Sequence, residues 1–90
     1  MSVSRELEII NKLGLHARAA AKLVTVAASF QSDIRLSRDG RTVNGKSIMG
    51  ILMLAAAMGT RLTVSAEGPD AEAALDQIEA LFAGRFGEEC

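Results

Sequence analysis

Ninety residues leave room for one domain, because compact domains span about 50–250 residues, and 49% apolar with 23% charged residues is typical of a folded globular protein. A net charge of −1 without a basic cluster excludes general affinity for nucleic acid. The longest apolar stretch, residues 48–58, is shorter than the roughly 20 residues that span a bilayer, and the N-terminus lacks the order of a signal peptide. We therefore expect one domain over residues 1–90, cytoplasmic and without membrane insertion.

The first half of the chain predicts a strand, a helix and a hairpin. Residues 2–10 alternate apolar and polar side chains, the period of a half-buried strand, with Arg5 interrupting the apolar face. Residues 17–30 have apolar side chains at three- and four-residue spacing, which is typical of an amphipathic helix. Residues 33–45 alternate again around an Asp-Gly turn at 39–40, a strong hairpin signal. The apolar positions of the first strand and helix are Val3, Leu7 and Ile9, then Ala20, Leu23, Val24, Ala27 and Phe30.

A second helix and a fourth strand follow the hairpin. Ser47 is a favourable N-cap residue, and we expect the helix that it begins to end near Gly59. Within this helix, Ile51 and Ala55 are the predicted core positions. The alternation over residues 62–66 then predicts a strand.

The chain ends with a third predicted helix. Residues 68–70, Gly-Pro-Asp, open it, because proline suits a first helical turn and an acidic side chain suits the positive end of the helix dipole. Gly84 is the expected stop, and the tail after it is expected to fray. The only cysteine, Cys90, cannot form an intrachain disulfide, and we expect it to be a free thiol with no metal site. The order βαββαβα indicates an α+β fold.

The single histidine, His16, stands where the first helix is predicted to begin. The amides of Ala17, Arg18 and Ala19 then have no partner within the helix, and together with the helix dipole they favour a bound anion. Neutral imidazole is a good nucleophile for a phosphoryl group, whose oxygens Arg18 can pair with. The simpler alternative is that His16 only caps the helix or lies on the surface. A metal site or a hydrolase triad is disfavoured, because no second ligand or oxyanion-binding turn is visible.

Two motifs carry a resemblance to a known family. "GLHARAAAKL" and, about thirty residues later, "NGKSIMGILML" resemble the histidine-containing phosphocarrier (HPr) family of the bacterial phosphotransferase system, including its nitrogen-related (NPr) branch. The resemblance implies an open-faced sandwich, with four antiparallel strands and three helices packed on one side. It also implies that His16 accepts phosphate through Nδ1 from phospho-Enzyme I and passes it to a IIA component. Arg18 is implied as the positive partner, and no cofactor is needed beyond the transient phosphoryl group.

One position departs from the family pattern. Where relatives usually have proline after His-Ala-Arg, this chain has Ala19. Proline in a first helical turn presets φ and removes an amide that lacks a partner. We therefore expect Ala19 to alter the rate of phosphotransfer or the lifetime of the phosphohistidine, without loss of the chemistry.

The second motif carries two further predictions. Ser47 is expected to cap its helix, and the resemblance implies that it is also a regulatory site, phosphorylated in some relatives by HPr kinase/phosphorylase. The apolar side chains around it exceed what one buried face needs, which indicates a docking surface for partner proteins. The predicted docking residues are Ala21, Lys22, Lys46, Ile48, Met49 and Leu52.

These observations favour a monomeric phosphocarrier, a stoichiometric relay without turnover of its own small substrate. Two other classes stay open. One is a purely regulatory binding module switched by phosphorylation of Ser47, and the other is a ligand-binding α+β domain, against which the lack of a glycine-rich phosphate loop counts. The choice between sugar uptake and the nitrogen-related branch also stays open.

Overall fold

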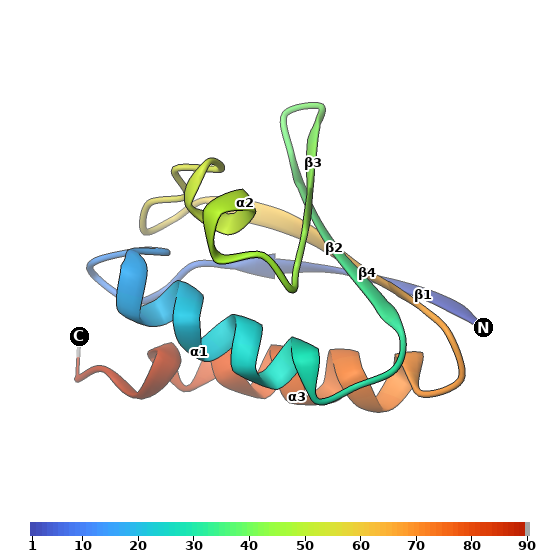
Figure 1. The fold of residues 1–90 in the computed structure, drawn as a ribbon. Helices are drawn as coiled ribbons and strands as arrows, with labels where there is room; N and C mark the ends of the chain where they lie inside the picture. Colours follow the sequence, from blue (N-terminus) through green and yellow to red (C-terminus); the bar gives the residue numbers. More distant parts are fainter. Residues whose placement is uncertain (90) are drawn as a thin grey trace.

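The computed structural model describes residues 1–89, which form a four-stranded antiparallel sheet with helices packed on one side (Figure 1). The strands are β1 (Ser2–Glu8), β2 (Asp33–Arg38), β3 (Arg41–Asn44) and β4 (Arg61–Glu67). The helices are α1 (Ala17–Ala28), α2 (Ile48–Leu52) and α3 (Ala71–Ala83), followed by one 3₁₀ turn, Arg85–Gly87. The predicted order βαββαβα and the open-faced sandwich are confirmed.

Strand pairing explains the alternating sequence patterns. The sheet has the order β1-β4-β2-β3, and each pair of neighbours is antiparallel. Leu7 of β1 pairs with Leu62 of β4, and Val64 pairs with Leu36 of β2, so the apolar side chains share one face. That face is covered by α1 and α3, and the polar side chains of the other face are exposed (Figure 1).

A single core fills the space between the sheet and the helices. Its members are almost all aliphatic. Burying each leucine, isoleucine, valine or phenylalanine side chain stabilises the fold by roughly 1.5–3 kcal/mol. None of the helices within residues 1–89 has the length and apolar character needed to cross a membrane. The largest fully buried apolar side chains are Ile9, Leu23, Ile34, Leu36, Ile51, Leu62, Val64, Leu75, Ile78 and Phe86.

Helix α2 is shorter than the sequence predicts. It ends at Leu52, well before Gly59, and the prediction of a longer helix was wrong. Two arginines from the β2–β3 hairpin bind the backbone carbonyl groups that directly follow α2. Arg38 Nη1 donates to the carbonyl oxygens of residues 54 and 55 at 2.7 and 3.0 Å, and Arg41 Nη1 donates to that of residue 53 at 2.9 Å. These bonds replace the hydrogen bonds that further helical turns would supply.

The early end of α2 also changes which of its residues are buried. Ala55, a predicted core residue, is exposed and has a φ of 50°, in the left-handed region. Ile51 is fully buried, as predicted, and the core is continued by Leu54 and Ala56. The three- and four-residue spacing therefore no longer predicts which side chains are buried after Leu52, where the helix ends.

Arg5 faces α3 from the edge strand β1. Its guanidinium group lies 2.8 Å from carboxylate oxygens of both Asp76 and Glu79 and 3.6 Å from Glu72. The interruption that Arg5 makes in the apolar face of β1 is therefore matched by three acidic residues along one side of α3.

The start of α3 differs from the prediction in the place of Pro69, which was expected in the first helical turn. Pro69 lies before the helix, and Asp70, at the N-cap position, does not cap α3 with its side chain. Its carboxylate instead accepts hydrogen bonds from the backbone N–H groups of Gln31 and Ser32 at 2.8 and 2.9 Å, and from Ser32 Oγ at 2.5 Å. Asp70 thereby joins the start of α3 to the segment between α1 and β2.

We expect Asp70→Asn to lower the free energy of unfolding at neutral pH and to have less effect in strong acid. The hydrogen bond from Ser32 Oγ, followed by that from the Gln31 amide, holds the pKa of the Asp70 carboxyl below its usual range. A carboxyl with a lowered native pKa stabilises the fold fully above its unfolded pKa, and this stabilisation is lost as the pH falls through the native value. Urea unfolding of both proteins at neutral and at strongly acidic pH measures the effect.

The control for this prediction is Asp33→Asn, which removes the same charge from an exposed strand position. A difference between wild type and Asp70→Asn that stayed constant across the pH range would contradict the assigned cause.

The tail after Gly84 is ordered, contrary to the expectation that it frays. Phe86 is fully buried, and its ring centroid lies 5.0 Å from that of Phe82 in α3. Lys22 Nζ of α1 donates to the Phe86 carbonyl at 2.6 Å. Cys90 lies outside the described residues. This packing brings the C-terminal segment beside the start of α1 (Figure 1).

Candidate functional site

His16 directly precedes α1, as the sequence predicts. Its backbone is extended, with φ −75° and ψ 178°, and its carbonyl accepts the first helical hydrogen bond from Ala20 N at 2.8 Å. Within residues 1–89 the imidazole makes no capping hydrogen bond to the helix. The alternative in which His16 only caps α1 through its side chain is therefore wrong.

The loop before His16 is fixed by the segment between α2 and β4. Leu15 N donates to the Ala56 carbonyl at 2.9 Å, and Gly59 N donates to the Ile9 carbonyl at 2.7 Å. Gly14 has a φ of +69° and lies against the backbone of Ala56. This close approach leaves no space for a side chain at position 14. Glycine there therefore allows the loop that carries His16 to pack against the backbone of Ala56.

The start of α1 has the features expected of an anion site. The three amides predicted to bind phosphate belong to Ala17, Arg18 and Ala19, the first three residues of the helix, which precede its first internal hydrogen bond. Ala17 and Arg18 are exposed, whereas the side chain of Ala19 is buried in the core. The first turn contains no acidic residue that would oppose an anion.

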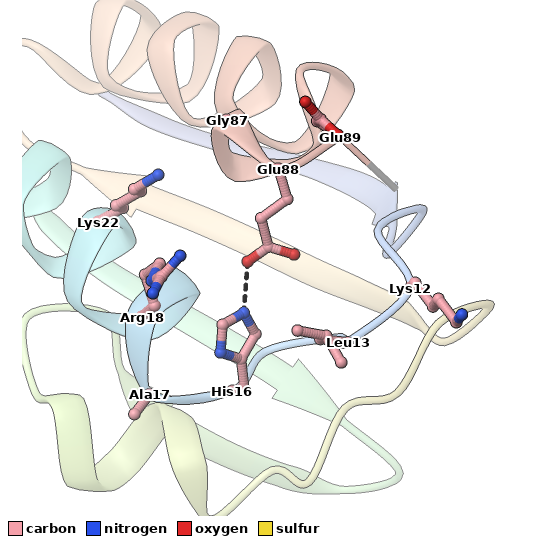
Figure 2. Close-up of a pocket in the computed structure, with 9 residues that line it drawn as sticks. All are labelled: Lys12, Leu13, His16, Ala17, Arg18, Lys22, Gly87, Glu88 and Glu89. Atoms are coloured by element: carbon pink, nitrogen blue, oxygen red, sulfur yellow. Dashed lines mark hydrogen bonds and ion pairs between the residues drawn. The ribbon is translucent and has the colours of Figure 1, made fainter.

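A pocket of about 840 Å³ opens at this helix end (Figure 2). The cationic side chains of Lys12, Arg18 and Lys22 contribute to its wall, and His16 lies in its floor. Figure 2 shows Arg18 and Lys22 extending from α1 toward the C-terminal segment, which carries Glu88 on the opposite side, whereas the Lys12 side chain points away from His16. The residues that line the pocket are Lys12, Leu13, His16, Ala17, Arg18, Lys22, Gly87, Glu88 and Glu89.

The carboxylate in this pocket was not predicted from the sequence. Glu88 Oε2 lies within hydrogen-bond distance of His16 Nε2, across 72 positions of sequence. Its other oxygen accepts a hydrogen bond from Asn11 Nδ2 at 3.0 Å. The hydrogen bond with His16, followed by that with Asn11, holds the pKa of the Glu88 carboxyl below its usual range, although partial burial acts in the opposite direction. No local motif marks this acidic residue, because only the packing of Phe86 brings it to His16.

The predicted docking residues fall into three groups. Met49 is 70% exposed and Ile48 41%, whereas Leu52 and Ala21 are half-buried. Both lysines bind backbone carbonyls: Lys22 Nζ donates to residue 86 and Lys46 Nζ to residue 30 at 2.9 Å.

The exposed apolar side chains of Met53 and Leu13 were not among the predicted docking residues. Met53 is 61% exposed at the end of α2, and Leu13 is 66% exposed beside His16. The spacing within α2 was the available signal for Met53, since it lies four positions after Met49 on the same helical face.

Ser47 caps α2, as predicted. Its hydroxyl oxygen accepts a hydrogen bond from Gly50 N at 3.1 Å, and its backbone is extended. The side chain is half-buried, next to the exposed Ile48 and Met49.

Comparison with known proteins gives one consistent result. The family model described as "PTS HPr component phosphorylation site" matches residues 3–84. Phosphocarrier protein HPr of Cupriavidus necator is 54% identical over 86 residues, which are 96% of this chain and 97% of that protein. Phosphocarrier protein NPr of Shewanella violacea is 43% identical over 86 residues, 96% of this chain and 94% of that protein.

A solved structure agrees with these sequence relatives. The crystal structure of HPr from Thermoanaerobacter tengcongensis has a TM-score of 0.95 and 44% identity, and the match covers 98% of this chain and 99% of that one. The fold, the family model and the relatives all agree with the resemblance carried by the two motifs, so the chain belongs to the HPr family, the phosphocarriers of the phosphotransferase system.

Proposed function

We propose that His16 carries the phosphoryl group, accepting it from phospho-Enzyme I and passing it to a IIA component as a monomer. The observation that carries this proposal is the place of the imidazole, at the start of α1 within a pocket that also holds three cationic side chains. Figure 2 shows the ring nitrogen that does not face Glu88 directed toward the start of the helix. An attacking Nδ1 would therefore place the phosphoryl oxygens near unpaired amides.

The chemistry needs a nucleophile and a stabilised set of oxygens. The lone pair of Nδ1 forms the bond to phosphorus while the donor's bond to the same phosphorus breaks. The negative charge on the transferred oxygens is then met by the amides of Ala17, Arg18 and Ala19 and by the Arg18 guanidinium group. Because the first turn of α1 lacks acidic residues, no side chain of that turn repels the group.

Partner proteins would contact the exposed apolar side chains of α2. Ile48, Met49 and Met53 are exposed there, and methionine side chains adapt to differently shaped partners. Helix α2 packs against α1, so this surface adjoins the helix that begins at His16. Leu52, Ala21, Lys22 and Lys46 would contribute from its border.

Ser47 is proposed as a separate regulatory site for an HPr kinase/phosphorylase. Its position at the start of α2, beside Ile48 and Met49, supports this role. A phosphate group there would add about two negative charges to the border of the docking surface.

Phosphorylation by phosphoenolpyruvate and the homologues of Enzyme I tests the proposal. We expect one acid-labile phosphoryl group by intact mass in the wild type and none in His16→Gln, which keeps a similar size without the nucleophile. Ser47→Ala is the control and should keep the acid-labile group. An acid-labile adduct on His16→Gln, or no adduct on the wild type with any homologue, would overturn the proposal. An acid-stable adduct formed with ATP and the kinase, and lost in Ser47→Ala, would support the regulatory role alone.

A further inference from the structure

We propose that Glu88 is a positioning residue for His16: it accepts a hydrogen bond from Nε2–H and thereby keeps the lone pair of the neutral ring on Nδ1. The inference rests on the proposed function, since it concerns the same histidine. The contact itself joins His16 Nε2 and Glu88 Oε2 (Figure 2). Only 12% of the Glu88 side chain is exposed, so water competes with this hydrogen bond less than it would for a surface pair.

A buried asparagine fixes the carboxylate from its other side. Asn11 is fully buried, and its Nδ2 donates both to Glu88 Oε1 at 3.0 Å and to the Gly14 carbonyl at 2.8 Å. Its Oδ1 has no hydrogen-bond partner within residues 1–89. The two hydrogen bonds of Asn11 Nδ2 therefore join the loop before His16 to the Glu88 carboxylate.

The segment that carries Glu88 is anchored independently of the carboxylate. Phe86 is fully buried, and its carbonyl accepts the hydrogen bond from Lys22 Nζ. The turn is closed by hydrogen bonds from Gly87 N to Gly84 O at 3.0 Å and from Glu88 N to Arg85 O at 2.9 Å. The carboxylate thus reaches His16 from a packed turn.

The hydrogen bond determines which nitrogen of the ring can react. A neutral imidazole has one N–H group and one lone pair, and the partner of one nitrogen decides which form is present. A carboxylate accepts only, so it selects the form with the proton on Nε2. Nδ1 then keeps its lone pair for phosphorus, on the side of the ring that faces the start of α1.

Phosphoryl transfer then needs no proton to leave the ring. The bond from Nδ1 to phosphorus forms as the donor's bond breaks, and the proton on Nε2 stays in place. The ring gains a positive charge, which the Glu88 carboxylate balances. When the phosphoryl group passes to the acceptor, the bond between Nδ1 and phosphorus breaks and its electron pair stays on Nδ1. The ring is then again neutral, with its proton on Nε2. The lowered pKa of the Glu88 carboxyl agrees with a charged acceptor at neutral pH.

The variant Glu88→Gln tests this role, with Glu67→Gln as the control that removes the same charge from an exposed position at the end of β4, outside the pocket. A glutamine has one oxygen for two donors, Asn11 Nδ2 and His16 Nε2. One of the two donors therefore loses its acceptor. If the glutamine side chain turns its NH₂ group toward Nε2, it donates to that nitrogen and favours the ring form with the proton on Nδ1. We expect ¹⁵N NMR of the neutral ring to show Nε2–H in the wild type and in Glu67→Gln, with a shift toward Nδ1–H in Glu88→Gln.

The second measurement is the rate of phosphotransfer from phospho-Enzyme I. Loss of a charge-assisted hydrogen bond predicts a rate about 10- to 100-fold lower in Glu88→Gln and unchanged in Glu67→Gln. An unchanged ring form in Glu88→Gln would overturn the inference, whether or not the rate falls. If no variant is phosphorylated, the proposed function fails, whereas the NMR result still decides whether Glu88 positions the ring.

Discussion

Phe86→Ala is expected to lower the free energy of unfolding by about 3–5 kcal/mol, the range for removing a buried phenylalanine side chain. The Phe86 ring is fully buried, is tilted by 54° against Phe82 and holds the last described turn on α1 and α3. Since small domains are stable by about 5–15 kcal/mol in total, this one substitution would remove a large share. Urea unfolding, followed by circular dichroism, measures the loss.

A half-buried phenylalanine provides the control for this prediction. Phe30 packs on the edge of the core, so Phe30→Ala should be less destabilising than Phe86→Ala. Phe86→Leu, which fills most of the space, should recover much of the stability. A loss in Phe86→Ala no larger than that in Phe30→Ala would mean that the tail is not part of the core.

Gly14→Ala is expected to destabilise the fold by about 2–5 kcal/mol, from two separate causes. The left-handed backbone at φ +69° costs a residue with a Cβ atom about 1–2 kcal/mol. The added Cβ would also lie 2.5 Å from the Ala56 carbonyl oxygen and 2.9 Å from Ala57 Cα, and such overpacking costs about 1–3 kcal/mol more. Thermal and urea unfolding would measure the sum.

Gly59→Ala separates these two causes. Gly59 has a φ of +89°, but a Cβ added there would have no heavy atom within 4 Å. This variant should lose only the backbone contribution, about 1–2 kcal/mol. Equal losses in both variants would show that the approach of Gly14 to Ala56 is unimportant. A larger loss in Gly14→Ala would confirm that the loop before His16 depends on this contact.

The elements that sequence patterns predicted well are those whose residues share one periodicity. The alternation over residues 62–66 lies within β4, and the spacing over residues 17–30 matches α1 apart from its last two residues. Ser47 was predicted as a cap because its hydroxyl acts on its own helix, three residues away. In each case the deciding interactions lie within a few residues of chain, or on one face of one element.

The wrong predictions share a different property. Helix α2 ends at Leu52 because Arg38 and Arg41 of the preceding hairpin bind the next carbonyls, and neither arginine differs locally from any surface arginine. Asp70 lies at the positive end of the α3 dipole, as expected, but the hydrogen bonds of its carboxylate to a segment 38 and 39 residues earlier in the chain were not predicted. The sequence shows the charges of Arg38, Arg41 and Asp70, but it does not show which groups these side chains bind.

The sequence by itself determined the order of the elements, the family and the place of His16 at the start of α1, because periodicity, capping and two motifs are local properties. Only the tertiary structure decided that the C-terminal turn packs beside that helix and brings Glu88 to the imidazole. The physical reason is that Phe86 is buried through contacts of its turn with both α1 and α3, two helices that lie far apart in the sequence from each other. Core packing of the C-terminal turn therefore determines that Glu88 faces His16, although the two residues lie 72 positions apart in the sequence.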